Sequence, residues 1–131
     1  MKYLNDYIDH KIKNLLIENG AFYAFNKKQF VIKKVEGVNY HHMGAGLYVP
    51  RSNAIKLSAQ MDAVLLEGIR QDVEENGIKD IIWRELANYE SQIVNNCEDT
   101  IKALEDYPVE VDEIIKEFNS YMQHCIDNDL F

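Results

Sequence analysis

Cysteine, proline and long apolar runs are all scarce in this sequence. Its 131 residues include only two cysteines, Cys97 and Cys125, and two prolines. No apolar run approaches the roughly 20 residues of a membrane-spanning helix, and the N-terminus lacks the apolar stretch of a signal peptide. We therefore expect a cytoplasmic protein without membrane contact, whose cysteines stay reduced and buried as small apolar side chains.

The scarcity of proline and glycine also argues against linkers and disordered segments. The chain has six glycines and two prolines, while apolar residues make up 47% of it, which is ordinary for a folded soluble protein. A chain of this length can bury enough apolar surface for one self-sufficient core. We expect a single domain spanning residues 1–131.

Positive charge is in short supply and unevenly distributed. Residues 1–60 hold nine Lys and Arg against four Asp and Glu, residues 61–131 hold five against eighteen, and the net charge is −8. This balance argues against a general nucleic-acid binder, which needs clustered basic side chains, so we expect no direct nucleic-acid contact. The opposite charges of the two halves predict a possible head-to-tail homo-oligomer.

Apolar periodicity predicts an α+β fold, mostly α, with about five helices packed on a small antiparallel sheet. Helical spacing covers residues 2–19, 26–35, 54–76, 79–94, 97–106 and a last segment from about residue 110. Segments rich in β-branched and aromatic residues predict strands at 21–25, 38–43 and 47–49. Asn26 followed by Gln29 is typical of a helix start, and Pro50 fits the first turn of the 54–76 helix.

The 54–76 segment has the broadest apolar face, so we expect it to be the central and most buried helix. Its apolar residues include Ile55 and Leu66. On the 79–94 helix, Glu90 falls on an otherwise apolar face. In the last helix we expect Val111, Ile114, Ile115, Phe118, Met122 and Cys125 to point inward.

Metal binding receives little support from the pattern of possible ligands. Adjacent residues on a strand point to opposite faces, so His41 and His42 cannot easily bind one ion together. His124 and Cys125 have the same fault on a helix, and neither a CxxC nor an HExxH motif occurs. We expect no metal and no cofactor.

A small-ligand site is one possibility, in the segment where aromatic residues, paired histidines and glycines replace helical periodicity. The turn at 44–46 could bring backbone N–H groups near an anion, although it lacks the Lys-Ser/Thr of a P-loop. The nearby lysines form either a local anion site or a solvated helix face: Lys27, Lys28, Lys33 and Lys34. The candidate ligand-binding residues are His41, His42, Gly44, Gly46, Tyr48, Arg51 and Glu90.

An acidic binding surface is a second possibility, in the second half of the chain. Most acidic faces are merely solvated, but fixed negative charge can also dock on a basic nucleic-acid channel of another protein. The candidate partner-binding residues are Glu98, Asp99, Glu105, Asp106, Glu110, Glu113 and Glu117. A further acidic patch is predicted at Glu67, Asp72, Glu74 and Glu75.

Several short motifs resemble those of a group of small uncharacterised proteins from phages and mobile elements of low-GC bacteria. The resemblance is carried by Phe22-Tyr23-Ala24-Phe25 with Gln29-Phe30, by Gly44-Ala45-Gly46-Leu47-Tyr48-Val49-Pro50, and by Glu85-Leu86-Ala87-Asn88-Tyr89-Glu90 with the helix of Asp99 and Leu104. In that group the Asn-x-Glu core often reads Asn-His-Glu, and here Tyr89 takes the place of the histidine. The resemblance implies no established activity, but it implies a bacterial host in which small acidic proteins interfere with host machinery.

These observations leave three hypotheses of different classes. The first is an accessory protein of a phage or mobile element that binds and inhibits a host protein, plausibly a defence enzyme that handles nucleic acid, as anti-CRISPR proteins do. The second is a small-ligand binder that sequesters a nucleotide signal through residues 38–51. The third is an enzyme using Glu90 and His42 for acid–base chemistry, which lacks an obvious nucleophile or metal set.

Overall fold

The structure is a computed structural model that describes all of residues 1–131. Its chain divides into two compact units: residues 2–68, and residues 69–131 together with Met1. The single domain expected from the length stays a prediction. The α+β fold with a small antiparallel sheet is confirmed, with seven α-helices instead of about five. None of the helices has both the length and the apolar composition needed to cross a membrane.

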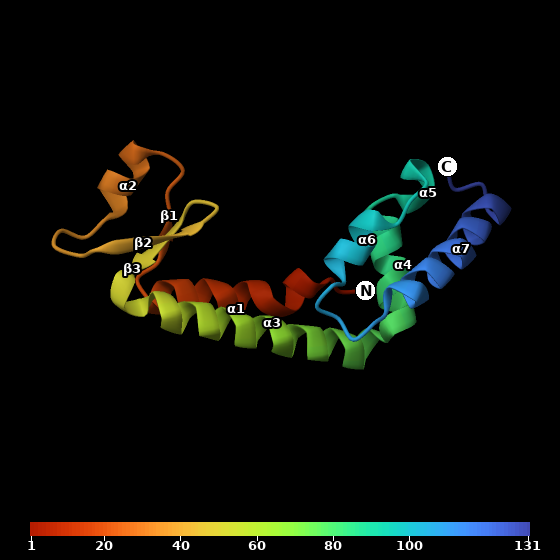
Figure 1. Ribbon diagram of the computed structural model, residues 1–131, viewed down its shortest axis with the longest axis horizontal. Helices are drawn as coiled ribbons and strands as arrows, with labels where there is room; N and C mark the ends of the chain where they lie inside the picture. Colours follow the sequence, from red (N-terminus) through yellow and green to blue (C-terminus); the bar gives the residue numbers. More distant parts are fainter. The chain divides into compact units, whose positions relative to one another are not determined.

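In the 2–68 unit, helix α1 (Leu4–Glu18) lies along the first part of α3 (Ala54–Asn76) (Figure 1). The two helices run antiparallel, because Asn19 at the end of α1 bonds Gln60 at 2.9 Å while Ile8 lies against Gly68. A Cβ atom at Gly68 would come within 2.3 Å of Cγ2 of Ile8. The absent side chain is thus what lets α1 approach α3 so closely.

The expectation that the 54–76 helix is the most buried one is wrong. Its bounds are as predicted, but Ile55 is 88% exposed and Leu66 is 63% exposed. In the 2–68 unit α1 covers one side of α3 (Figure 1). The exposed Ile55 and Leu66 are therefore not covered by α1. The most buried helix is α4 (Ile78–Asn88), where Ile81, Ile82 and Leu86 are completely buried.

The sheet has three antiparallel strands in the order β1-β3-β2: β1 (Phe22–Tyr23), β2 (Tyr40–Gly44) and β3 (Leu47–Pro50). One face buries Leu47 and Val49 of β3. The other face presents aromatic rings to α2 (Lys27–Lys33), so that Phe30 lies 4.8 Å from Tyr48, measured between ring centroids. All three predicted strands are therefore confirmed.

The first strand is shorter than the predicted residues 21–25, because the chain leaves the ladder early. Ala24 still donates its backbone N–H to Gly46, but the N–H of Phe25 donates to the side chain of Gln29. Pro50 also differs from its prediction. It ends β3 instead of starting the long helix, and a 3-10 turn, Arg51–Asn53, comes before α3.

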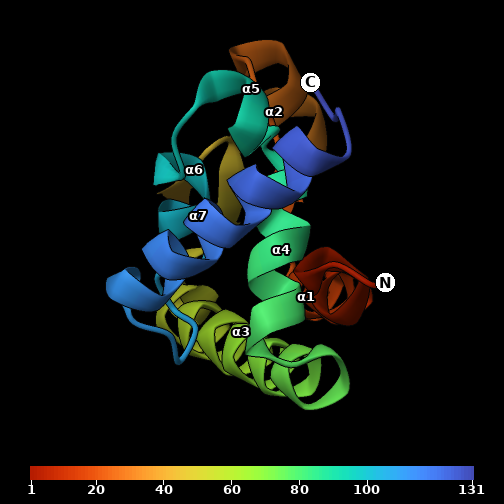
Figure 2. The same cartoon turned by 90° about the vertical axis from the view of Figure 1, so that its right-hand side faces the viewer.

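In the 69–131 unit, α7 (Val111–Asp127) crosses α4 (Figure 2). Two short helices, α5 (Ser91–Val94) and α6 (Glu98–Ala103), precede it. Ile114, Tyr121 and Cys125 form the buried stripe of α7, and Cys97 is also buried. Both cysteines are free and buried, as predicted, whereas Val111 and Ile115 are exposed instead of pointing inward.

The single helix predicted over residues 79–94 is two helices, because the chain reverses at Glu90. Glu90 has a φ of +49°, a left-handed conformation that usually belongs to glycine at a helix end. The N–H of Tyr89 accordingly bonds back to Glu85, and that of Glu90 bonds back to Ala87. No glycine or proline marks this turn, and the apolar periodicity continues across it. The sequence therefore predicts one helix instead of two.

The close approach of α1 to α3 gives a stability prediction. Replacing Gly68 by Ala should lower the free energy of unfolding by about 1–3 kcal/mol, because the new methyl group overpacks against Ile8. This loss should exceed the gain in helix propensity of about 1 kcal/mol. Urea denaturation followed by circular dichroism measures it. In an Ile8→Ala background, which removes Cγ2, the same change should be neutral or stabilising; an equal loss in both backgrounds would contradict the steric argument.

Candidate functional site

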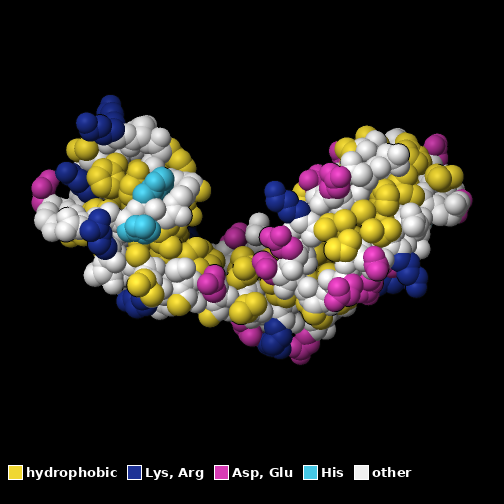
Figure 3. Space-filling view, viewed as in Figure 1, with side chains coloured by type: hydrophobic (Ala, Val, Ile, Leu, Met, Phe, Trp, Pro, Cys, Tyr) yellow, Lys and Arg dark blue, Asp and Glu magenta, His cyan; other side chains and the backbone are white.

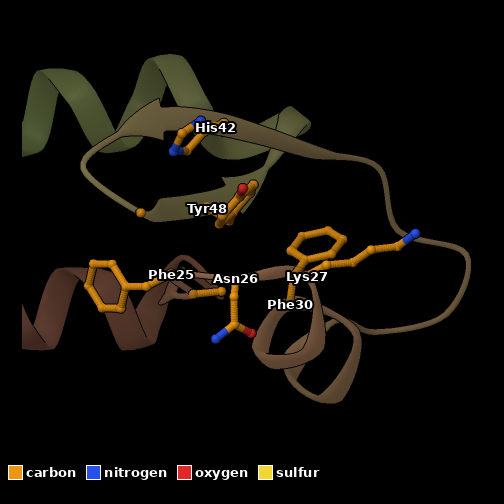
Figure 4. Close-up of a pocket in the computed structure, with 8 residues that line it drawn as sticks. Phe25, Asn26, Lys27, Phe30, His42 and Tyr48 are labelled. Atoms are coloured by element: carbon orange, nitrogen blue, oxygen red, sulfur yellow. The ribbon is translucent and has the colours of Figure 1, made fainter.

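A pocket of about 440 Å³ lies between the start of α2 and the sheet (Figure 4). One side comes from the segment that joins β1 to α2, and the other from β2, β3 and the turn between them. Its lining residues are Ala24, Phe25, Asn26, Lys27, Phe30, His42, Gly46 and Tyr48. Small-molecule sites have volumes of roughly 300–1,000 Å³, so the pocket is large enough for such a ligand.

The pocket is mainly aromatic. His42 and Tyr48 are opposite each other on neighbouring strands, and their rings stack with centroids 4.6 Å apart and planes 16° apart. Phe30 lies against Tyr48 on the same side of the sheet (Figure 4). Phe25 stands at the rim and is 73% exposed. The site therefore offers several flat π surfaces to an occupant.

Local features of the sequence hold this side of the pocket in shape. The Asn26 side chain accepts a hydrogen bond from the N–H of Gln29 at 2.8 Å, which caps α2 as the sequence predicted. Gly46 has a φ of +78°, and a Cβ atom there would come within 2.6 Å of the Phe25 ring. Any side chain at residue 46 would therefore push Phe25 away from its place at the rim.

The electrostatics of the pocket favour anions. Lys27 is its only formally charged lining residue, and no Asp or Glu lines it. Residues 19–61, which include the sheet and α2, carry six Lys and Arg against the single acid Glu36. Figure 3 shows histidine side chains on the visible face of this unit beside apolar surface. The aromatic site thus has one basic lining residue and lies in a segment of net positive charge.

The structure brings together only some of the predicted ligand-binding residues. His42, Gly46 and Tyr48 line the pocket. His41 pairs with Val49 and so lies on the opposite face from His42, as expected from the alternation of a strand. The remaining predicted residues lie outside the pocket: Gly44 in the hairpin, Arg51 in a separate pocket of about 460 Å³, and Glu90, exposed, in the 69–131 unit.

Four lining residues were not among the predicted ligand contacts, namely Ala24, Phe25, Asn26 and Phe30. Their signal in the sequence was the aromatic run that precedes a capped helix start. That signal predicts a strand followed by a helix and no pocket, because the packing of α2 over the sheet depends on contacts far apart in the sequence. Ring contacts from Phe30 to Phe22, Tyr40 and Tyr48 now show it.

The predicted acidic residues lie on α6, the loop after it, and the start of α7. Within residues 98–113 seven carboxylates are exposed, against one lysine, Lys102. Figure 3 shows acidic side chains at several places on the visible face of this unit. Glu117 differs from the other predicted residues: it is half-buried and accepts a hydrogen bond from the Trp83 indole at 3.4 Å. It belongs to the packing of α4 against α7.

A buried ionic cluster in the same unit was missed entirely. Asp72, predicted to lie in an exposed acidic patch, is completely buried in the last turns of α3. Both of its oxygens accept from Arg84, at 2.9 and 3.0 Å, and one also accepts from the hydroxyl of Tyr107 at 2.5 Å. Asn76 donates to the other oxygen at 2.8 Å, and Arg84 also donates to Glu85 at 2.9 Å. This cluster joins α3, α4 and the segment after α6.

The cluster shifts the pKa values of its members in the directions that their partners dictate. Burial by itself raises the pKa of Asp72, but hydrogen bonds from Arg84, Tyr107 and Asn76 outweigh it, and the net pKa lies below the usual value. Burial together with the bond to the charged Asp72 raises the pKa of Tyr107. Asp72 is therefore ionised and Tyr107 neutral over the physiological range. Every strong donor and acceptor in the cluster has a partner, so its role is structural.

Other candidate chemistry finds no support in the geometry. No three side chains among His, Cys, Asp and Glu are arranged to hold a metal ion. Cys97 is buried, and this burial raises the pKa of its thiol, which disfavours the nucleophilic thiolate. In the same unit burial raises the pKa of Tyr121 to about 12, and its hydroxyl bonds Gln92. Neither residue lines the pocket beside α2 or the pocket that contains Arg51.

Comparison with known proteins places the chain in a family but not in a function. The model of a family of unknown function, DUF7659, matches residues 4–124. A search of curated proteins and a search of solved structures each found no match.

The buried cluster gives a pH-dependent stability prediction. Asp72→Asn should lower the free energy of unfolding by about 3–5 kcal/mol at pH 7, because it leaves the Arg84 charge buried with less compensation. The folded pKa of Asp72 lies below its unfolded value near 4, so its contribution is fully present above that value and is lost as pH falls through the folded pKa. The difference between wild type and variant should therefore shrink below about pH 4.

Chemical denaturation at several pH values measures this difference. Glu74→Gln is the matched control, because Glu74 makes only an exposed pair with Arg70 and should cost at most about 1 kcal/mol. Tyr107→Phe should lower the free energy of unfolding by an intermediate amount, about 1.5–3 kcal/mol, since it removes one hydrogen bond to a charged group. A loss for Asp72→Asn no larger than that of Glu74→Gln would contradict the argument.

Proposed function

The chain belongs to this family of unknown function, and we propose that it is an accessory protein of a phage or mobile element that binds and inhibits a host protein. The partner is a host enzyme that handles nucleic acid, such as a defence nuclease, and the inhibitor works as anti-CRISPR proteins do. The observation that supports this proposal is the exposed acidic surface formed by residues 98–113 of α6, the following loop and the start of α7.

The charge of this acidic surface is dense and has little local compensation. Seven exposed carboxylates share 16 residues with Lys102 alone, and the 69–131 unit as a whole carries sixteen acidic against five basic residues. The two buried acids Asp72 and Glu85 are paired with Arg84, so almost all of the excess lies on the outside. A basic channel that normally binds phosphates would attract such a surface over long distances.

The surface also combines charge with exposed apolar groups. Val111 and Ile115 are four residues apart on α7, so they lie on one face of the helix, and both are exposed. They flank the exposed carboxylates of Asp112 and Glu113. An interface needs an apolar centre as well as complementary charge, because exposed charge pairs alone contribute little affinity. This arrangement favours a protein partner over a purely solvated acidic face.

The enzyme hypothesis lacks a comparable arrangement. The pocket that contains His42 is lined entirely by residues of the 2–68 unit and includes no carboxylate. His42 therefore has no acid there with which to share a proton. Glu90 is exposed and occupies the strained turn after α4. Its left-handed backbone serves the reversal of the chain at this point.

A matched pair of charge-reversal variants tests the proposal. Glu105→Lys, Asp106→Lys and Glu110→Lys together reverse exposed positions of the acidic surface. Asp9→Lys, Glu18→Lys and Glu36→Lys reverse three exposed acids of the 2–68 unit and change the net charge by the same amount. Tagged wild type and both variants are used to purify partners from a low-GC bacterial lysate, and each partner's activity on nucleic acid is assayed with added protein.

The proposal predicts a stoichiometric host protein whose nucleic-acid activity falls on addition of the wild type. The surface variant should bind it at least about tenfold more weakly, and the control variant should bind it as the wild type does, since one lost charge-assisted contact can cost a factor of ten. Binding should weaken with salt and be competed by DNA. Equal losses in both variants would show an effect of net charge alone, and undiminished binding by the surface variant would exclude the acidic surface.

A further inference from the structure

We infer that the pocket between α2 and the sheet binds a free mononucleotide. This goes beyond the proposed function, because it concerns the 2–68 unit and a small ligand. The sequence placed a possible nucleotide site on the 38–51 segment, and the structure moves it: the β1–α2 segment forms one wall, while Arg51 lies in another pocket. The ligand class follows from the shape and the charge of the pocket.

The shape of the pocket suits a planar aromatic group. His42 and Tyr48 form a stacked pair, and Phe30 packs against Tyr48 from α2. Phe25 stands at the rim with most of its side chain in solvent. Covering this ring with a ligand would be favourable, because it removes apolar surface from water. The Phe25 ring lies over Gly46, so closely that residue 46 has no room for a side chain. A base inserted here would stack on aromatic faces and cover part of Phe25.

The charge of the pocket selects an anion. Aromatic cages can also bind quaternary ammonium groups, but such a cation would meet Lys27 and no compensating carboxylate. Lys33 is held by the backbone oxygen of Tyr23 at 2.6 Å, and Lys34 lies 3.9 Å from Glu36. Lys27 makes no ion pair, and its side chain extends past Phe30 on the side away from Phe25 (Figure 4), so its ammonium group is available to a phosphate at that end of the pocket. A nucleotide combines such a planar aromatic ring with a phosphate, and it is the ligand that we infer.

The size of the site favours a free nucleotide over a nucleic-acid strand. Strand binding needs a track of basic groups with successive stacking platforms. Here a single pocket of about 440 Å³ has one lining lysine, and the chain as a whole is acidic. A second phosphate of a strand would meet no further cation in the lining of this pocket.

Calorimetric titration of the full chain with adenosine monophosphate, adenosine and inorganic phosphate tests the inference. The monophosphate should bind about tenfold more tightly than adenosine, and phosphate alone should show no measurable binding. Lys27→Gln should reduce the affinity for the monophosphate to that for adenosine. Phe25→Ala should weaken the binding of both the monophosphate and adenosine by about tenfold or more, since base stacking is lost. Both positions are exposed, so circular dichroism should show an intact fold.

Lys28→Gln is the matched control, because Lys28 neighbours Lys27 in α2 but does not line the pocket. It should leave all affinities unchanged. Three results would overturn the inference. These are a failure of the monophosphate to bind at millimolar concentration, an equal loss of affinity for it in the Lys27 and Lys28 variants, and an unchanged affinity for it in Phe25→Ala. Tighter binding of a ten-residue oligodeoxyadenylate than of the monophosphate would instead identify a nucleic-acid strand as the ligand. The acidic-surface variant should bind the monophosphate normally, which separates this test from that of the proposed function.

Discussion

A buried carboxylate holds the 69–131 unit together. Asp72 is removed from water, so its charge must be compensated within the protein, and Arg84, Tyr107 and Asn76 supply that compensation. Because these partners come from different segments, the cluster fixes the end of α3 against α4 and against the loop that follows α6. The acidic surface includes that loop, so the position of its carboxylates depends on an almost completely buried charge pair.

The 2–68 unit follows a different constraint, because aromatic rings instead of aliphatic side chains pack on one face of its three-stranded sheet. One face of the sheet buries Leu47 and Val49, and the other relies on rings from Phe22, Phe30 and Tyr48. Large flat rings cannot fill space as evenly as branched side chains, and a two-residue first strand covers little of the sheet. The result is a half-open aromatic face, and the pocket beside α2 lies at its edge.

The two units also differ in charge, and this difference separates their proposed roles. The 2–68 unit carries nine basic and six acidic residues, while the other carries five and sixteen. An anionic ligand and a basic protein partner would therefore be drawn to different parts of the same chain. The same asymmetry underlies the possible head-to-tail association of copies, which stays a prediction.

The sequence by itself determined the elements whose signals are local. The apolar stripe of α1, the bounds of α3, the three strands and the Asn26 cap all follow from spacing over a few residues, as does the placing of His41 and His42 on opposite faces. What only the tertiary structure decided involves partners far apart in the chain. Asp72 resembled an exposed acid until Arg84 and Tyr107 were brought to it, and the periodicity of α4 concealed the turn at Glu90. Phe25 became a pocket residue only when α2 folded over the sheet, because burial is set by what packs against a side chain.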